Sequence, residues 1–343
     1  MTVQADVGRH ARQHARWHWS EIAFWILTMA CAFLFPSRYL IMTDIVRLAL
    51  FALSLDLILG YAGIVSLGHA AFFGVGAYSA GLLALHGIVT EPVVALVVAG
   101  LVATAVGFLT SFLVIRGLDL TRLMVTLGIA LLLEALAERF SNITGGTDGL
   151  QGIEMQPILG LFAFDMFGKV GFFYCVAVLF VLFLLARRIV HSPFGLSLRA
   201  IRNNPLRAAA IGIPVNKRLI AIYTLAAFYA GIAGALFTQT TALASLDVFS
   251  FERSADLMLV LVIGGTGYLY GGLIGAVVFK MLQEVFSTIT PQYWQFWIGL
   301  VLVVIVLVGR ARLHRWALWA PNLIIRKFGG RKTIVAVPES DAS

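Results

Sequence analysis

Charged residues and cysteines are scarce in this chain of 343 residues. Asp, Glu, Lys and Arg make up 12% of it, against about 25% in soluble globular domains. Hydrophobic residues make up 60%. A soluble fold of this length cannot bury so many apolar runs of about twenty residues, whereas lipid solvates them directly. The composition excludes an ordinary soluble protein and predicts an all-α polytopic integral membrane protein.

Several site signatures are also missing. The two cysteines, Cys31 and Cys175, fall in separate apolar runs, so we expect neither a disulfide framework nor a metal site. No HExxH, GxSxG or GxxxxGK[ST] occurs, which argues against a metalloprotease, a serine hydrolase and an ATPase. The net charge of +8 lies mainly in tails and one loop, which favours membrane lipid over nucleic acid as its partner.

The apolar runs number nine by inspection, and the eighth is too long for one helix. Its 32 residues, 254–285, would form a helix of about 48 Å, against a hydrocarbon core of about 30 Å. The run also contains IGGTGYLYGGLIG, and glycines disfavour a continuous helix. We therefore expect two segments here, either two crossings or a re-entrant pair. The other runs are 21–36, 44–60, 66–86, 92–115, 119–137, 170–186, 219–242 and 291–309.

The distribution of positive charge gives the orientation. With about ten transmembrane helices and both termini inside, the inside segments hold 19 of the 25 Lys and Arg, as the positive-inside rule requires. The predicted parts are a basic cytoplasmic tail, a transmembrane domain with one long cytoplasmic and one long outer loop, and a basic amphipathic tail on the inner leaflet. The tails are residues 1–20 and 311–343, and the transmembrane domain is 21–310. Within that domain the cytoplasmic loop is 187–218 and the outer loop is 138–169.

A glycine-rich stretch from Leu55 to Ala84 contains the first candidate site residues. It favours either close helix packing alone or a helix broken where a solute pathway passes. In the second interpretation Gly60 to His69 is an unwound joint and Ser66 caps the next helix. His69 is expected chiefly to form an interhelical hydrogen bond. The candidate pathway residues are Asp56, Gly60, Gly63, Ser66, His69, Gly264 and Gly265.

Carboxylates inside apolar runs support a different transport mechanism. Intramembrane carboxylates are functional candidates by default, and Asp56 and Glu134 would suit a proton-coupled secondary transporter. Arg47 and Lys280 are conceivable partners of Asp56. Transport without an ATPase would identify that alternative.

The cytoplasmic loop contains a predicted short helix. Asn204 is a capping residue before Pro205 in the first turn, and Gly212 stops the helix. With exposed alanines and arginines, this segment suits docking into a groove of another protein, or contact with anionic lipid. The candidate docking residues are Arg199, Arg202, Asn203, Asn204, Pro205, Arg207, Ala208, Ala209 and Gly212.

Four stretches together resemble the LivM-like permease subunits of bacterial ABC importers for branched-chain amino acids. GYAGIVSLGHAAFFGVGAYSAGLLA looks like the family's GYAGQLSLGHAAFFGIGAYTAALL pattern, and TGGTDGLQGI looks like its outer-loop signature. RAIRNNPLRAAAIGIPVNKRLIAIYTLAAFYAGIAGALF resembles its cytoplasmic EAA-type loop, and LVLVIGGTGYLYGGLIGAVV its late glycine-rich segment. They occur in the expected order and cover most of residues 50–310.

The resemblance implies a multi-pass protein of the bacterial inner membrane that translocates branched-chain or similar amino acids by alternating access. It implies that about residues 195–213 form a coupling helix on a separate ATP-binding-cassette ATPase, so this chain would be no enzyme and hold no cofactor. A second homologous permease subunit and a periplasmic solute-binding protein are the other implied partners. Asp56 and Ile64 stand where the family usually has Asn and Gln.

Overall fold

The computed structural model describes residues 19–117, 119–165 and 167–308. This part of the chain consists of helices joined by turns and loops, with two isolated β-bridges, so the predicted all-α fold is confirmed for it. The chain divides into two compact units, residues 1–282 and 283–343. The predicted amphipathic tail at 311–343 and most of the tail at 1–20 lie outside the described residues.

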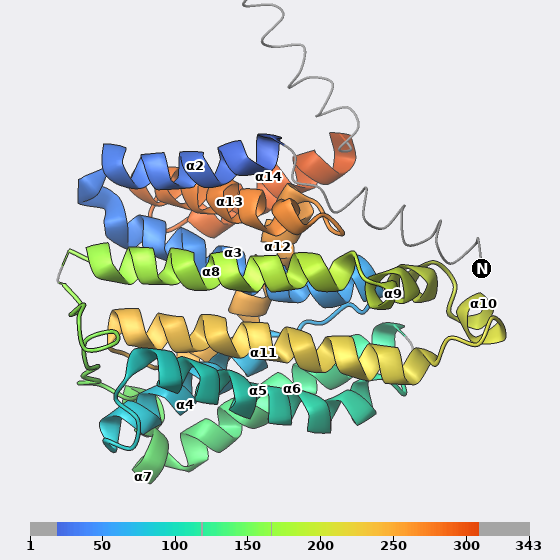
Figure 1. The fold of residues 1–343 in the computed structure, drawn as a ribbon, viewed down its shortest axis with the longest axis horizontal. Helices are drawn as coiled ribbons and strands as arrows, with labels where there is room; N and C mark the ends of the chain where they lie inside the picture. Colours follow the sequence, from blue (N-terminus) through green and yellow to red (C-terminus); the bar gives the residue numbers. More distant parts are fainter. Residues whose placement is uncertain (1–18, 118, 166, 309–343) are drawn as a thin grey trace, which may run out of the picture. The chain divides into compact units, whose positions relative to one another are not determined.

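The helices follow one another along the chain as shown in Figure 1. The α-helices are α2 (Trp19–Leu34), α3 (Tyr39–Ala62), α4 (Ala70–Leu85), α5 (Pro92–Val114), α6 (Asp119–Arg139), α7 (Ser141–Thr144), α8 (Lys169–Val190), α9 (Pro193–Asn203), α10 (Pro205–Ala210), α11 (Val215–Thr241), α12 (Phe251–Gly264), α13 (Leu269–Ile289) and α14 (Trp294–Val308). The 3₁₀ turns are η1 (Pro36–Arg38), η2 (Gly146–Asp148) and η3 (Leu246–Phe249).

Small residues bring the central helices of the first unit together. α11 packs against α3, α4 and α5. A methyl group on Gly76 of α4 would overlap the backbone of Gly231 in α11, and one on Gly107 of α5 would overlap the side chain of Ala227. Close backbone approach of this kind is typical of helices that associate in lipid.

Six helical segments in the described part are long and apolar enough to cross a membrane. Three shorter apolar helices accompany them, Glu21–Leu34, Ala70–Leu85 and Trp294–Ile305. These helices indicate a multi-pass membrane protein, while the number of ten crossings stays a prediction. The six segments are Pro36–Ala62, Pro92–Val114, Leu120–Arg139, Lys169–Val190, Val215–Thr241 and Leu269–Ile289.

The overlong eighth apolar run is divided into α12 and α13, as predicted. Residues 265–268 separate the two helices. A methyl group on Gly264 would overlap the carbonyl of Gly271, and one on Gly275 would overlap the carbonyl of Val260. These pairings place α12 and the start of α13 side by side and antiparallel, so the glycines serve both the break and the packing beyond it.

The loop between α6 and α8 is attached to the segment that follows α11. Leu150 and Ala244 exchange two backbone hydrogen bonds, of 2.8 and 3.0 Å. Gly149 has a φ of 69°, and a Cβ on it would overlap the carbonyl of Ala244. The turn-rich TGGTDGL stretch therefore has a structural role, which is to hold the chain that leads into α12.

Candidate functional site

The chain leaves helical geometry between α3 and α4, at residues 63–69. Gly63 has a φ of 76°, a conformation that residues with a Cβ rarely adopt, and its N–H donates to the carbonyl of Ile58. The predicted joint from Gly60 to His69 is confirmed from Gly63 onward, whereas Gly60 still lies in the last turn of α3.

A second break, between α12 and α13, meets the end of α3. The Oδ1 atom of Asp56 accepts a hydrogen bond of 2.7 Å from the backbone N–H of Gly267. Asp56 is fully buried. At Gly60, one turn further along α3, an added Cβ would lie 2.5 Å from the N atom of Gly267. The absence of a side chain at Gly60 is therefore what lets this hydrogen bond form.

An arginine of the α9–α10 segment, residues 193–212, contacts the same point. Arg202, in the last turn of α9, donates from Nη1 to the carbonyl oxygen of Gly60. One turn earlier in α9, the guanidinium of Arg199 lies over the ring of Tyr61, 5.3 Å from its centroid. We call Asp56, Gly60, Gly267 and Arg202 the helix-break joint. It links α9 to α3 and to the α12–α13 break.

His69 forms the expected interhelical contact, with a partner that the sequence analysis did not identify. It is fully buried, and its Nε2 lies 2.8 Å from the Oγ atom of Ser54 in α3. Its ring stacks on Phe51 with centroids 5.7 Å apart. His69 is therefore held against α3 at the start of α4.

The predicted capping role of Ser66 is wrong. α4 begins at Ala70, four residues later, and its N-cap residue is His69, which makes no side-chain cap hydrogen bond. The backbone N–H of Ala70 instead donates to the Oγ atom of Ser254 in α12, at 3.0 Å. A serine distant in sequence thus accepts the hydrogen bond from the first N–H of α4. The local sequence around Ser66 therefore could not predict the cap.

The short helix predicted after Asn204 is confirmed. The Asn204 side chain accepts from the backbone N–H of Arg207 at 2.9 Å, α10 begins at Pro205, and Gly212 has a φ of 88°. α9 and α10 lie together at one end of α8 and α11 (Figure 1). Ala208 is buried, at 2% exposure, so the expectation that it is exposed is wrong.

The remaining surface of this segment is accessible. Leu206 and Ile211 are 82% and 75% exposed, and both lie beside the exposed Arg207. Exposed large apolar side chains next to a cation on a short helix are suited to protein contact. The other candidate docking residues Asn203, Pro205, Ala209 and Gly212 are also exposed, and Asn204 is partly buried.

The suggested pairing of Asp56 with Arg47 is wrong. Arg47 precedes Asp56 by nine residues in α3, or about 14 Å along the helix axis. It forms an ion pair with Asp44 and a 2.5 Å hydrogen bond to Thr240 of α11.

Asp256 of α12 is a carboxylate that the sequence analysis missed. It lies close enough to Lys280 of α13 for their charges to interact. The sequence analysis singled out Lys280 in the same apolar run, but not Asp256. In the described part of the chain, no group of three or more His, Cys, Asp or Glu is placed to hold a metal ion.

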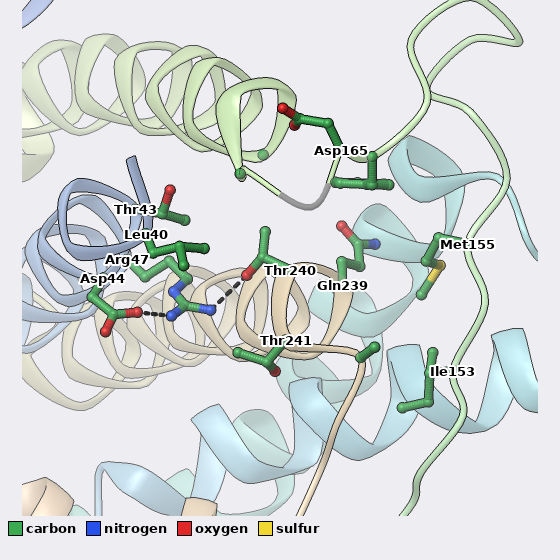
Figure 2. A pocket seen from close by; sticks show the side chains of 14 residues that line it. Leu40, Thr43, Asp44, Arg47, Ile153, Met155, Asp165, Gln239, Thr240 and Thr241 are labelled. Atoms are coloured by element: carbon green, nitrogen blue, oxygen red, sulfur yellow. Dashed lines mark hydrogen bonds and ion pairs between the residues drawn. The ribbon is translucent and has the colours of Figure 1, made fainter. Parts of the chain in front are cut away.

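A cavity of about 580 Å³ lies at the opposite end of α3 from the helix-break joint. It is bounded by the first turns of α3 and α8, the last turns of α11 and the loop that precedes α8. Figure 2 shows the Arg47 guanidinium between Asp44 and Thr240 at this cavity. No sequence pattern drew attention to it, because its walls come from three stretches that are distant in sequence, residues 40–47, 153–171 and 239–242.

Residues 38–306 match the family described as branched-chain amino acid transport system / permease component. The chain belongs to this family. The helix-break joint, α9, α10 and the cavity all lie within the matched residues.

Several curated relatives are similar over most of this chain. It is 27% identical over 279 residues to the high-affinity branched-chain amino acid transport system permease protein LivM of Escherichia coli, covering 74% of this chain and 64% of that protein. It is 28% identical to a probable LivH of Methanocaldococcus jannaschii, covering 70% and 77%. An autoinducer 2 import system permease, LsrC of Salmonella choleraesuis, is 26% identical, covering 84% and 85%.

The chain thus spans about two thirds, 64%, of the length of the LivM relatives from Escherichia coli and Salmonella typhimurium. No solved structure matches it.

Proposed function

We propose that this chain is the transmembrane permease subunit of an ATP-binding-cassette importer and that it moves branched-chain amino acids into the cytoplasm by alternating access. Its proposed partners are ATPase subunits that bind and hydrolyse ATP, a second homologous permease subunit and a periplasmic solute-binding protein. The family match and the names of the LivM and LivH relatives support this function. The proposed location is the bacterial inner membrane.

The observation that carries the proposal is the contact between α9 and the two helix breaks. An importer driven by a separate ATPase needs a cytoplasmic element that moves with the ATPase and is attached to the translocation pathway. Arg202 supplies that attachment, because it binds Gly60 beside the Asp56–Gly267 hydrogen bond. A displacement of α9 would pull on the end of α3 and on the α12–α13 break together.

Different residues of the α9–α10 segment are proposed to bind the ATPase and to transmit its movement to the transmembrane helices. Leu206, Arg207 and Ile211, on and just after α10, face outward and form the proposed contact with the ATPase, together with Asn203, Pro205 and Ala209. Arg199 and Arg202 face α3. The segment thus has one surface for the partner and another for the permease itself.

The proposed topology has ten crossings with both termini inside. α13 is long and apolar enough to cross a membrane, and α12 packs antiparallel against its start. α12 has 14 residues, or about 21 Å, shorter than a bilayer core of about 30 Å. In this topology the chain from Ala242 to Ser250, which includes η3, completes that crossing. Half-length helices that end at broken backbone are typical of transport pathways.

Alternating access then requires each partner to favour one state. A bound ligand shifts an equilibrium only as far as its affinities for the two states differ. ATP on the partner subunit is expected to favour one arrangement of α9, and the solute-loaded binding protein to favour the same arrangement from the other side. Gly267, Gly264 and Gly265 provide the backbone freedom for the change.

Uptake in proteoliposomes tests this function. The permease pair would be reconstituted with and without the ATPase subunits, with the binding protein and radiolabelled leucine outside and ATP inside. We expect accumulation only with ATPase and ATP. Sustained accumulation without the ATPase would refute the proposal and favour a proton-coupled transporter that uses Asp56 and Glu134.

The solute needs a separate experiment, because relatives named as ribose and autoinducer 2 import permeases also match this chain. We expect unlabelled isoleucine and valine to compete with leucine, and ribose to leave leucine uptake unchanged. If ribose reduced leucine uptake and isoleucine and valine did not, the result would favour sugar transport.

A further inference from the structure

The cavity at the far end of α3 has charges of both signs, apolar walls and open access. Its volume of about 580 Å³ falls within the range of about 300–1,000 Å³ that is usual for small-molecule sites. It lies on the opposite side of the first unit from α9 and α10, which places it at the outer side of the membrane in the proposed orientation. The lining residues include Leu40, Thr43, Asp44, Arg47, Ile153, Met155, Phe164, Asp165, Gly168, Gly171, Gln239 and Thr240.

Arg47 is the fixed positive charge of this cavity. It is 7% exposed, and its guanidinium lies 4.9 Å from the centroid of the Phe237 ring. Its side-chain hydrogen bonds to Asp44, Thr240 and the Phe237 carbonyl use three of the five N–H donors that a guanidinium has. The α8 N-terminus, at Lys169, also borders the cavity through Gly168 and adds partial positive charge.

Acceptors are in excess at the same cavity. Asp44 has 43% of its side chain exposed, so its pairing with Arg47 leaves part of the carboxylate accessible. Among the described residues, the Asp165 side chain accepts one hydrogen bond, from Val170 N to Oδ1 at 3.0 Å. Gln239 is 5% exposed, its Nε2 donates to the Pro92 carbonyl, and its Oε1 has no hydrogen-bond partner among the described residues.

A buried amide oxygen without a partner normally has a bound ligand or water in the native state. Here that oxygen belongs to a residue of the cavity wall, beside two carboxylates and one guanidinium, with Leu40, Ile153 and Met155 as apolar walls. A ligand that satisfies these groups has an ammonium for the acceptors, a carboxylate for the remaining guanidinium donors and an aliphatic body for the walls.

We propose that this outer cavity binds the zwitterion of an aliphatic α-amino acid before it enters the translocation pathway. The ammonium lies toward Asp165, Asp44 and the Gln239 oxygen, and the carboxylate lies toward Arg47. The site is distinct from the helix-break joint at the other end of α3. The inference rests on the proposed function for its outward orientation, while the lining itself gives the ligand class.

Equilibrium binding of radiolabelled leucine to the purified permease pair with its ATPase, in lipid nanodiscs and without the binding protein, tests the site. The first variant is Asp165→Asn, which keeps the oxygen that caps Val170 and removes the charge. We expect about tenfold weaker leucine binding, the usual consequence of losing one interaction with a charged group. Asp247→Asn is the matched control, because Asp247 is an exposed carboxylate paired with Arg253 and does not line the cavity.

A second variant fills space without removing a hydrogen bond. A methyl group on Gly171 of α8 would have its nearest neighbour, Thr240 Cγ2, at 3.5 Å, an ordinary contact distance. Gly171→Ala therefore fits the fold and favours the helix, yet takes volume from the cavity. We expect it to keep or raise the melting temperature and to weaken leucine binding. Gly128→Ala in α6, where a methyl group meets nothing within 4 Å, is its control.

Two ligand analogues locate the charges. Isocaproate lacks the ammonium of leucine, so it should bind weakly and be insensitive to Asp165→Asn. Leucinamide lacks the carboxylate that is proposed to lie toward Arg47, so it should bind more weakly than leucine.

No leucine binding by the wild-type complex, or equal binding by wild type, Asp165→Asn and Gly171→Ala, would overturn the inference. ATP-driven leucine uptake in the same preparation would then leave the proposed function intact. Absence of uptake together with intact, Asp165-dependent leucine binding would instead refute the proposed function alone.

Discussion

Arg202→Ala is the substitution that best separates the transmission of movement from α9 to α3 from the binding of the ATPase to α10. The variant removes the hydrogen bond from Nη1 to the Gly60 carbonyl and leaves Leu206, Arg207 and Ile211 unchanged. If α9 acts through the helix-break joint, the ATPase should still bind, while its activity should lose its response to the solute-loaded binding protein.

The size of the effect follows from the contact. A hydrogen bond with a charged donor contributes about 1.5–3 kcal/mol. Arg202 is exposed over part of its side chain, so solvent competition brings the value nearer to about 1 kcal/mol. That free energy changes the ratio of the two states by about fivefold. We therefore expect the stimulation of ATP hydrolysis by binding protein and leucine to fall by about fivefold.

The assay compares three complexes in nanodiscs by ATPase rate and by co-purification. Arg202→Lys keeps a cationic donor and should restore part of the stimulation. Arg207→Glu inverts a charge on the outward surface, so it should reduce the amount of ATPase that co-purifies. Loss of the ATPase from the Arg202→Ala complex, or unchanged stimulation in it, would refute the assignment of Arg202 to transmission.

Three further substitutions test the geometry around the joint. Gly267→Ala places a Cβ on a residue with φ of 83° and 3.0 Å from Arg202 Nη1, so we expect a loss of about 1–2 kcal/mol in stability and reduced uptake, measured by thermal melting and transport. Gly76→Ala overlaps the Gly231 backbone and should cost about 1–3 kcal/mol, with a lower melting temperature as the readout; an unchanged value would contradict the packing. Ser54→Ala removes the partner of His69 and should cost about 1 kcal/mol, whereas Ser54→Thr should retain most of the stability.

Much of the helical organisation was predictable because it depends on composition and local pattern. The break within residues 254–285 followed from length and glycine content, and α10 followed from Asn204, Pro205 and Gly212. These features are set by bilayer thickness and by backbone preferences that act within a few residues. The same local signals supported the interpretation of His69 as a buried interhelical group.

The helix-break joint itself could not be predicted from local pattern. Asp56 and Gly267 are 211 residues apart, and Arg202 and Gly60 are 142 apart. The sequence showed polar groups and glycines in separate stretches. Only the packing of α3, α9 and α12 brings these residues together. The capping role predicted for Ser66 was wrong for the same reason, because Ser254 from another helix caps α4.

α3 connects the outer cavity to the helix-break joint, and this arrangement has a measurable consequence. Arg47 and Gly60 are 13 residues apart on one continuous helix, or about 20 Å along its axis. A tilt of α3 would move the guanidinium at the cavity and the carbonyl that binds Arg202 together. Effects at sites this far apart normally add within about 0.5 kcal/mol.

A double-mutant cycle on leucine binding distinguishes coupling from independence. Asp165→Asn acts at the cavity and Arg202→Ala at the joint, and the complex would be measured with and without a non-hydrolysable ATP analogue. If α3 transmits the state of α9, the analogue should change the leucine affinity of the wild type, and Arg202→Ala should remove most of that change. Strict additivity, with an analogue effect unaltered by Arg202→Ala, would show that the two ends of α3 act independently.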